Sequence, residues 1–317
     1  MTTDLSCAAL RARLSDLPAA IAAAESRYHR QVDAVAARLL SGSGRQVVLL
    51  AGPSSSGKTT TANFLADRLR AAGHFAAVVS LDDFYRSPTA DPAYPRLPDG
   101  TPDFESVDAL HTDEIHACME TLLSGEEYLV PRYDFKIAAR RGGGMPLRLP
   151  QAGVVIFEGL HALNPKMDVG MPDGGLLRLF VSVSTNITEE DGTRVLSGRK
   201  IRFLRRLCRD HLSRAFPARR TYEVWQNVLA GEDRNLYPYK HRADCAINTF
   251  HDYEIGVLRP FDEALLSAPD APQGDYIEVV RAALSRFAPI PADLVPETSL
   301  LREFIPGGVY ESLYLNE

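Results

Sequence analysis

A glycine-rich octapeptide between an apolar run and a helical pattern constrains the fold of this chain more than any other feature. The run at 46–51 (QVVLLA) is short and continuously apolar, which is typical of a strand buried on both faces of a parallel sheet. Gly52–Thr59 (GPSSSGKT) follows directly, and apolar residues at helical spacing then predict a helix from about Thr59 to Ala72. Strand, turn and helix in this order match the GxxxxGK[ST] pattern of a phosphate-binding loop.

The composition of this loop indicates how it binds an anion. Its glycines let the backbone curl so that successive N–H groups and the N-terminus of the following helix point at one phosphate group. The Lys58 ammonium would bridge the outer phosphates of a nucleotide, and the Thr59 hydroxyl would ligate Mg²⁺. The predicted nucleotide contacts in and after the loop are Gly52, Ser54, Ser55, Ser56, Gly57, Lys58, Thr59 and Thr60.

Short apolar runs alternate with helical patterns along most of the remaining chain. Further strands are predicted at 78–81, 154–157, 177–183 and 243–249, and helices near 107–123, 200–214, 218–230 and 275–287. Strands that alternate with helices predict an α/β fold with a doubly wound, mainly parallel sheet and helices on both faces.

The segments outside this alternation suggest a division of the chain. Leucine and alanine at helical spacing over 5–40 predict one or two helices, and so an N-terminal helical extension over residues 1–45. The P-loop domain would cover 46–288, and a proline-rich C-terminal tail 289–317, with one short helical segment at 299–304. Inside the domain, 86–106 reads as a long functional loop and 138–150 as a hairpin or flap.

Composition excludes several classes of protein. Hydrophobic residues make up 45% and charged residues 24% of the chain, as in ordinary globular proteins and unlike disordered ones. The four cysteines are far apart, which argues against a disulfide framework and a zinc site. No apolar run is long enough to span a membrane, and the N-terminus lacks a signal-peptide core, so we expect a cytoplasmic protein without a membrane partner.

Carboxylates stand at the ends of two predicted strands. Asp82 and Asp83 follow the second strand, and Glu158 ends the third. The carboxyl ends of parallel strands form the ligand-binding edge of such sheets, where a kinase needs an acid to activate the attacking hydroxyl. We expect Asp82 to do this and to hold Mg²⁺ through water, with Glu158 as a second metal ligand. The alternatives are a turn cap for the aspartates and an ordinary strand-end acid for Glu158.

Missing motifs narrow the class of P-loop protein. The sequence has no NKxD guanine motif, no LSGGQ motif of transporter ATPases, and no Asp-Glu pair at the end of its third strand, as motor-like ATPases have. These absences favour a small-molecule kinase.

A basic segment supports that interpretation. Residues 194–220 contain ten basic residues and one acid, Asp210, which makes a local charge of +9 in a chain of net charge −6. Phosphoryl transfer depends on positioning and charge stabilisation, so an arginine-rich lid over the triphosphate is predicted here. The alternatives are a solvated basic face and an RNA-binding strip; the few aromatics nearby and the acidic net charge argue against nucleic acid.

Taken together, these strings resemble the uridine kinase/phosphoribulokinase family of P-loop kinases. The matching segments run in order over residues 46–250, and the ending SLLREFIPGG is similar to the C-terminal kinase part of longer bacterial uridine-kinase-like proteins. The segments are AGPSSSGKTT, SLDDFYR, PRYDF, VVIFEGLHALNP, RRLCRDHLSR and VWQNVLAGEDRNLYPYKHRADCAINT.

The resemblance implies a role for individual residues. It makes Asp82 the catalytic base with Lys58 and Arg209 as catalytic partners, and places Thr59, Glu158 and Asp82 at Mg²⁺. Arg206, Arg209 and Arg214 would be lid residues on the phosphates of ATP. The implied acceptor-site residues are Tyr85, Glu105, Tyr133, Phe135 and Arg140.

Two departures from the family pattern leave the acceptor open. Ala138 and Val224 stand where uridine kinases have the His and Gln that read the pyrimidine. A hydrogen-bonding site rejects analogues strongly, whereas an apolar site does not. The leading hypothesis is a nucleoside kinase that uses ATP and Mg²⁺; the alternatives are a sugar, sugar-phosphate or polyol kinase and a non-catalytic nucleotide-binding regulator. The apolar faces of the N-terminal helices and the tail could form a homo-oligomer interface or pack on their own domain.

Overall fold

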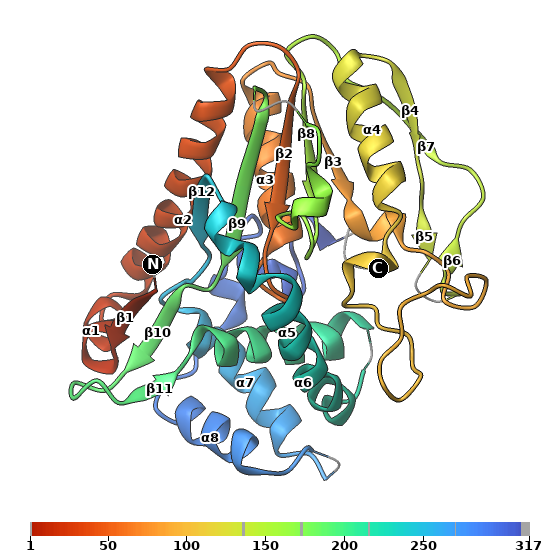
Figure 1. Cartoon of the computed structure of the whole chain (residues 1–317). Helices are drawn as coiled ribbons and strands as arrows, with labels where there is room; N and C mark the ends of the chain where they lie inside the picture. The colour runs from red at the N-terminus through yellow and green to blue at the C-terminus, as the bar shows by residue number, and fades with distance from the viewer. Residues whose placement is uncertain (1, 135–136, 172–173, 215, 270, 312–317) are drawn as a thin grey trace.

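A five-stranded, all-parallel sheet forms the centre of the protein in the computed structural model, which describes residues 2–134, 137–171, 174–214, 216–269 and 271–311, without the side chain of Arg214 (Figure 1). The strand order is β12-β9-β2-β8-β3, and every neighbouring pair is parallel. The strands are β12 (Cys245–Asn248), β9 (Leu176–Ser182), β2 (Gln46–Ala51), β8 (Val154–Glu158) and β3 (Ala76–Ser80). The predicted parallel sheet is confirmed.

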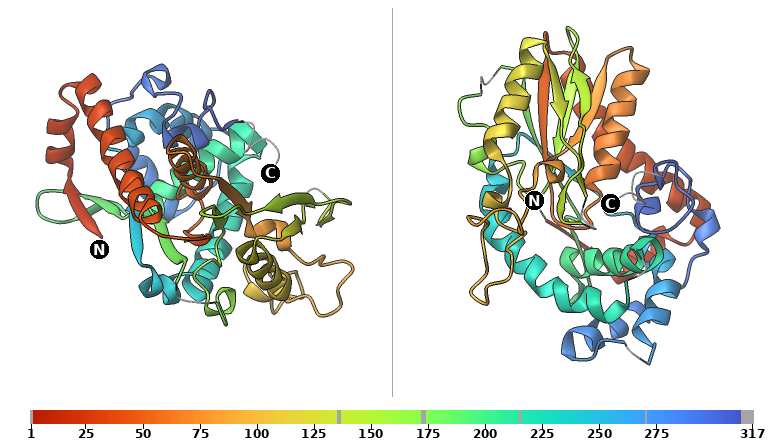
Figure 2. Two further views of the ribbon diagram at one scale, coloured as in Figure 1. Left: turned by 90° about the horizontal axis from the view of Figure 1, so that it is seen from above. Right: turned by 90° about the vertical axis from the view of Figure 1, so that its right-hand side faces the viewer.

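Helices cover both faces of this sheet, as the doubly wound prediction requires. Along β2, Val48 and Leu50 point into a core shared with α2 (Leu17–Leu40) and α3 (Lys58–Ala71). Val47 and Leu49 point into a second core, shared with α4 (Thr112–Ser124). Figure 2 shows α3 and α4 on opposite faces of the sheet. Alternation of side chains along one strand therefore divides the interior into two cores.

A helical layer lies beyond the carboxyl ends of the strands (Figure 1). It contains α5 (Gly198–Arg214), α6 (Ala218–Asn235), α7 (Glu254–Leu266) and α8 (Asp275–Leu284). α7 is not among the predicted helices, because Pro260 interrupts its helical pattern. This layer faces the edge of the sheet where the phosphate-binding loop lies.

The N-terminal segment contains a strand in addition to the predicted helices. β1 (Thr3–Ser6) precedes α1 (Cys7–Arg13) and pairs in parallel with β10 (Thr185–Thr188), which pairs with β11 (Arg194–Leu196). The prediction of helix from residue 5 was wrong at this point, because the strand depends on a partner about 180 residues away. β1 therefore forms because it pairs with β10, and no local pattern in the sequence predicts it.

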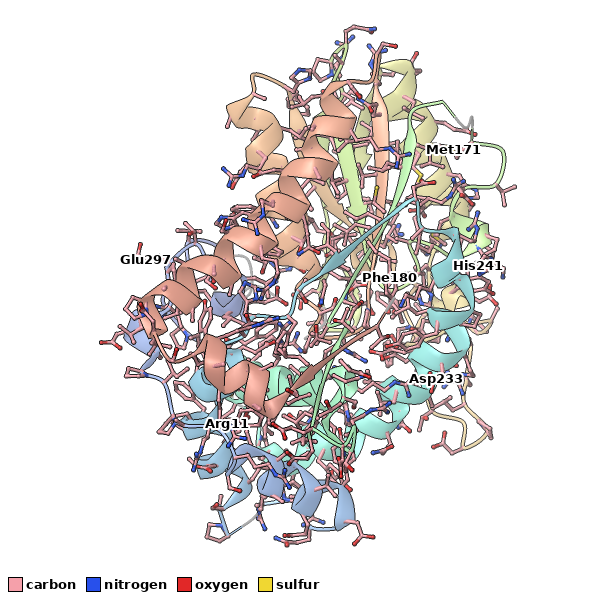
Figure 3. The ribbon with its side chains drawn as sticks, turned by 90° about the vertical axis from the view of Figure 1, so that its left-hand side faces the viewer. Arg11, Met171, Phe180, Asp233, His241 and Glu297 are labelled. Carbon is pink, nitrogen blue, oxygen red and sulfur yellow. The ribbon has the colours of Figure 1, made fainter. Side chains whose placement is uncertain are left out.

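Two short antiparallel strand pairs, one inside the other in sequence, complete the fold. β4 (Glu127–Val130) pairs with β7 (Met145–Arg148), and β5 (Tyr133–Asp134) pairs with β6 (Ala139–Arg140). The flap predicted at 138–150 thus forms the returning half of a longer hairpin. Elsewhere, Phe180 of β9 is buried in the interior while Asp233 lies at the surface (Figure 3). Within the described residues, no helix combines the length and apolarity that a bilayer crossing needs.

Candidate functional site

The glycine-rich loop leaves the end of β2 and enters α3 in a geometry that depends on two glycines. A Cβ on Gly52 would collide with the Val181 carbonyl oxygen. Gly57 has φ +86° and is the N-cap of α3, and a Cβ there would lie 2.6 Å from the Leu300 side chain. The loop therefore needs glycine both for close approach and for a left-handed backbone.

Two arginines of α5 donate hydrogen bonds to backbone carbonyl oxygens of this loop. Arg202 donates to the Ser54 carbonyl oxygen at 2.8 Å, and Arg205 donates to the Ser55 carbonyl oxygen at 3.5 Å. Both guanidinium groups are fully buried. Part of the basic segment predicted to form a lid therefore supports the loop backbone.

Each of these arginines has a buried acidic partner. Arg202 pairs with Glu232 of α6 at 2.7 Å, and Arg205 pairs with Glu254 of α7 at 2.6 Å. Glu232 also accepts a hydrogen bond from the Ser54 backbone N–H at 2.8 Å. Removing either partner would leave a buried charge uncompensated. These pairs therefore hold α5, α6, α7 and the loop together.

A cavity of about 190 Å³ opens in front of the loop. It brings together predicted residues from five separate parts of the chain. These are Ser54, Ser55, Lys58 and Thr59 of the loop and helix, Asp82 and Tyr85 after β3, Glu105 and Glu158, and Arg206 and Arg209 of α5.

The oxygen donors at the base of the cavity fit a shared magnesium ion. The Thr59 hydroxyl donates to Glu158 Oε1 at 3.5 Å, and the Ser80 hydroxyl donates to the same oxygen at 3.2 Å. Within the described residues, no three His, Cys, Asp or Glu side chains gather closely enough to hold a metal by themselves. Mg²⁺ usually takes one or two carboxylates and completes its shell with water and nucleotide phosphates, so this donor set suits it.

Two arginines of α5 face the cavity. Arg206 Nη1 donates to Ser54 Oγ at 2.7 Å, and Arg206 and Arg209 both pair with buried Asp210, at 3.1 and 2.9 Å. Asp210 therefore orients two guanidinium groups beside the loop. The predicted contacts Arg214 and Phe135 lie outside the described side chains.

Glu105 comes from the long 86–106 loop and reaches the cavity through a contact with α6. A Cβ on Gly231 would lie 2.6 Å from the Glu105 Cβ, so only glycine lets the loop approach this closely. Burial raises the pKa of Glu105 to about 7, and the neighbouring Glu232 carboxylate adds to the rise. Glu105 is thus poised to change its charge near neutral pH.

The other predicted acceptor-site residues do not all meet in this cavity. The Tyr85 and Tyr133 rings are 5.6 Å apart, and the Tyr85 hydroxyl donates to the Phe104 carbonyl oxygen at 2.8 Å. Arg140 instead pairs with Glu114 at 2.7 Å and lines a second cavity of about 360 Å³, which Tyr85 also lines. The predicted acceptor-site residues Tyr85, Glu105 and Arg140 are therefore divided between two cavities, and Tyr85 lines both.

The departures from the family pattern lie away from the main cavity. Ala138 has φ +51°, and its carbonyl oxygen accepts a hydrogen bond from the Ser87 hydroxyl at 3.1 Å. Val224 is 37% exposed on α6 and is not among the residues that line either cavity.

Sequence reasoning missed two acids that line the main cavity, Glu232 and Glu303. Glu232 lies within a matched segment, but the nearby acids Glu223 and Asp233 on the same helix made it indistinguishable from surface residues. Glu303 lies in the proline-rich tail, where the only available signal was the SLLREFIPGG string.

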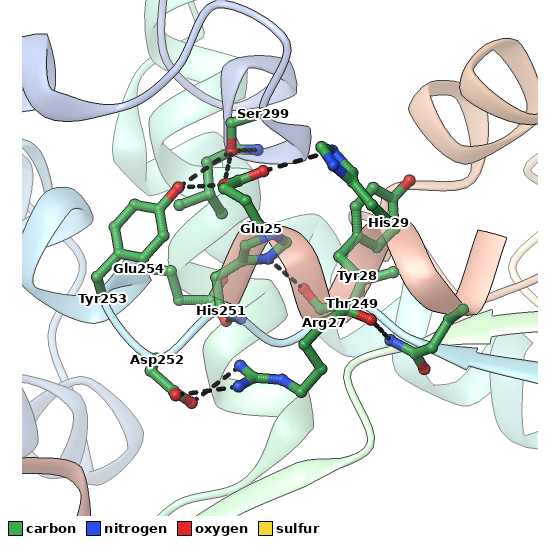
Figure 4. A network of polar contacts seen from close by, with 12 residues as sticks. Glu25, Arg27, Tyr28, His29, Thr249, His251, Asp252, Tyr253, Glu254 and Ser299 are labelled. Carbon is green, nitrogen blue, oxygen red and sulfur yellow. Dashed lines mark hydrogen bonds and ion pairs between the residues drawn. The ribbon is translucent and has the colours of Figure 1, made fainter. Parts of the chain in front are cut away.

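A buried polar network joins the two ends of the chain behind the loop (Figure 4). Glu25 of α2 accepts hydrogen bonds from the Tyr253 hydroxyl and from the Ser299 hydroxyl, the latter at 2.7 Å. The His251 Nε2 atom lies 3.5 Å from Glu25 Oε1. The neighbouring Tyr28 hydroxyl is 3.0 Å from the Thr61 hydroxyl of α3. Segments from both termini therefore contact the first turns of the helix that follows the loop.

Comparison with known proteins shows that the central part of the chain is similar to a family of kinases. The sequence profile of the Phosphoribulokinase / Uridine kinase family matches residues 47–255. The chain is 26% identical over 212 residues to the chloroplastic uridine/cytidine kinase UKL1 of Arabidopsis thaliana, a match that covers 67% of this chain and 39% of that protein. The chain therefore spans about two fifths of the length of that relative.

Two further comparisons concern bacterial proteins. The uridine kinase of Leuconostoc citreum (strain KM20) is 29% identical over 164 residues, 52% of this chain and 68% of that protein. A solved structure from Silicibacter sp. TM1040, provisionally assigned as a fructose transport system kinase, has a TM-score of 0.49 and 22% identity, over 68% of this chain and 98% of that one.

Proposed function

The chain belongs to the phosphoribulokinase/uridine kinase family, and from that premise we propose that it is an ATP-dependent kinase of a small molecule. It would transfer the γ-phosphoryl group to a primary hydroxyl of a nucleoside. The observation that carries the proposal is that Lys58, Thr59, Asp82 and Glu158 line one cavity beside the glycine-rich loop.

The residues of the cavity divide the work of the reaction. The Asp82 carboxylate would accept the proton of the acceptor hydroxyl as its oxygen bonds to the γ-phosphorus and the bond to the β-phosphate oxygen breaks. Lys58, Arg206 and Arg209 would stabilise the charge on the phosphate oxygens and on the departing ADP. Mg²⁺, when bound near Thr59 and Glu158, would neutralise part of the triphosphate charge.

The acceptor side supports a hydroxyl-bearing molecule. In its ionised form Glu105 can accept hydrogen bonds from vicinal hydroxyl groups, as a ribose presents them. The Tyr85 and Tyr133 rings beside it offer an apolar surface for a base.

A coupled assay of ADP release, over a panel of nucleosides, pentoses, polyols and sugar phosphates, tests the proposal. We expect a nucleoside to raise ADP release well above background hydrolysis. If only a sugar, polyol or sugar phosphate raised ADP release, the protein would still be a kinase, but its acceptor would not be a nucleoside. Tight ATP binding with no acceptor-dependent release over the whole panel would contradict the kinase and favour a nucleotide-binding regulator.

A further inference from the structure

The C-terminal segment forms one wall of the main cavity, although it lies outside the matched region 47–255. Its short helical turn Leu300–Glu303 packs on the loop, where Leu300 fills the space beside Gly57. Leu300 and Leu301 are fully buried, and Glu303 is only 6% exposed. This wall was not foreseen from the motifs of the family.

Glu303 occupies a place that suits an anion. Its Oε2 atom accepts hydrogen bonds from the Thr60 hydroxyl at 2.5 Å and from the Thr60 backbone N–H at 3.4 Å. Thr60 is the third residue of α3, and the N–H groups in the first turn of a helix point out of its N-terminus, toward an acceptor outside the helix. The N-cap, Gly57, has no side chain that could supply one. Glu303 thus caps α3 from 243 residues away.

The backbone around Glu303 is firmly held. Arg302 donates to the carbonyl oxygens of Ala292 and Val295, at 3.2 and 2.5 Å. On the other side, the Phe304 ring packs 5.0 Å from the Arg205 guanidinium carbon. We therefore expect the Glu303 side chain, and not the segment, to move when a ligand enters.

On the premise of the proposed function, we propose that Glu303 is a donor-site residue that lowers the affinity for the nucleotide. Its carboxylate competes with the phosphate chain for the Thr60 N–H and hydroxyl. A phosphate oxygen on the Thr60 N–H would lie beside the Glu303 carboxylate, and two negative charges so close together repel each other. Binding must therefore turn the carboxylate away, and the resulting weaker binding speeds the release of ADP.

Titration with Mg²⁺-ADP, followed by calorimetry, compares the wild-type chain with Glu303→Gln and Glu297→Gln. Glutamine keeps the shape of Glu303 and removes its charge. Glu297 is an exposed acid of the same tail and provides the matched control (Figure 3). We expect Glu303→Gln to bind ADP about tenfold more tightly and Glu297→Gln to bind as the wild type does.

Thermal unfolding provides a second measurement. The rise of Tm on addition of ADP reports on ADP binding, and a variant that is merely less stable would not show a larger rise. Glu303→Gln should have a lower Tm without ligand, because it loses its charged cap, but a larger rise of Tm on addition of ADP. Unchanged or weaker ADP binding in a chain that still phosphorylates an acceptor would overturn this inference and leave the kinase proposal standing. Failure of all three chains to bind ADP would overturn both.

Discussion

The proposed donor and acceptor sides of the site are held by different kinds of interaction. On the donor side, the loop rests on the buried pairs Arg202–Glu232 and Arg205–Glu254. On the acceptor side, the hairpin is held by the pair Arg140–Glu114, whose side chains are 31% and 34% exposed.

This contrast follows from what each side has to recognise. A phosphate chain is the same in every turnover, and charge stabilisation requires groups that are already in position. Acceptor contacts come from a loop and a hairpin, the kind of segment that changes most readily between related proteins. The proposed donor site thus lies against the buried core, whereas the proposed acceptor site lies on more exposed segments.

The largest expected effect concerns the proposed base. Asp82→Asn should lower kcat about 10³-fold, or ~4 kcal/mol, because the acceptor hydroxyl loses its proton acceptor. ADP affinity, measured by calorimetry, should stay nearly unchanged. Asp83→Asn is the matched control, since its carboxylate accepts a hydrogen bond from the Tyr133 N–H at 3.0 Å. Full activity in Asp82→Asn together with loss in Asp83→Asn would reverse the two roles.

The next effect tests the contrast between the two sides directly. Arg205→Met leaves Glu254 as an uncompensated buried charge and should lower the free energy of unfolding by about 3 kcal/mol. Arg140→Met removes the partly exposed pair with Glu114 and should lower it by less than about 1 kcal/mol. Urea denaturation of both variants measures the difference. Equal losses would remove the distinction between a buried donor side and an accessible acceptor side.

A smaller effect follows from the pKa of Glu105, which is about 7 in the folded chain against 4.5 ordinarily. Between these values the folded chain keeps a proton that the unfolded chain has lost, so this group lowers stability as pH rises from 4.5 to 7. Above pH 7 the full loss persists, and below 4.5 it vanishes. Glu105→Gln should therefore be more stable than the wild type at pH 8, by about 2 kcal/mol, and nearly equal at pH 4.

Urea midpoints at several pH values check this prediction. In the same variant, kcat/KM for the acceptor should lose the part of its pH profile that rises through about 7 in the wild type. Parallel stability profiles for the two chains would show that Glu105 does not titrate in this range.

The smallest effect concerns backbone strain in the acceptor hairpin. Ala138 has φ +51°, a region that glycine adopts without a Cβ clash. Ala138→Gly should therefore raise the free energy of unfolding by about 0.5 kcal/mol, the strain relief exceeding the added entropy of the unfolded chain. Ala139→Gly, in strand β6, is the control and should destabilise. A loss of stability in Ala138→Gly would indicate that this backbone is not strained.

The predictable part of the site consists of residues that directly follow strands. β2, β3 and β8 are neighbours or next neighbours in the sheet, so Thr59, Asp82 and Glu158 had to lie near one another once the strands were recognised. The predicted acceptor residues Tyr133 and Arg140 lie on a hairpin whose position no local pattern specifies.

The sequence by itself determined the parallel sheet, the phosphate-binding loop and the convergence of the strand-end acids. Each depends on periodicity or spacing within a few turns of chain, which local geometry converts directly into structure. The tertiary structure alone decided which arginines hold the loop and which face the cavity, since Arg205 and Arg206 are adjacent in the chain but have different partners. It also brought Glu303 to Thr60, because long-range packing of an apolar segment, and no local signal, sets that contact.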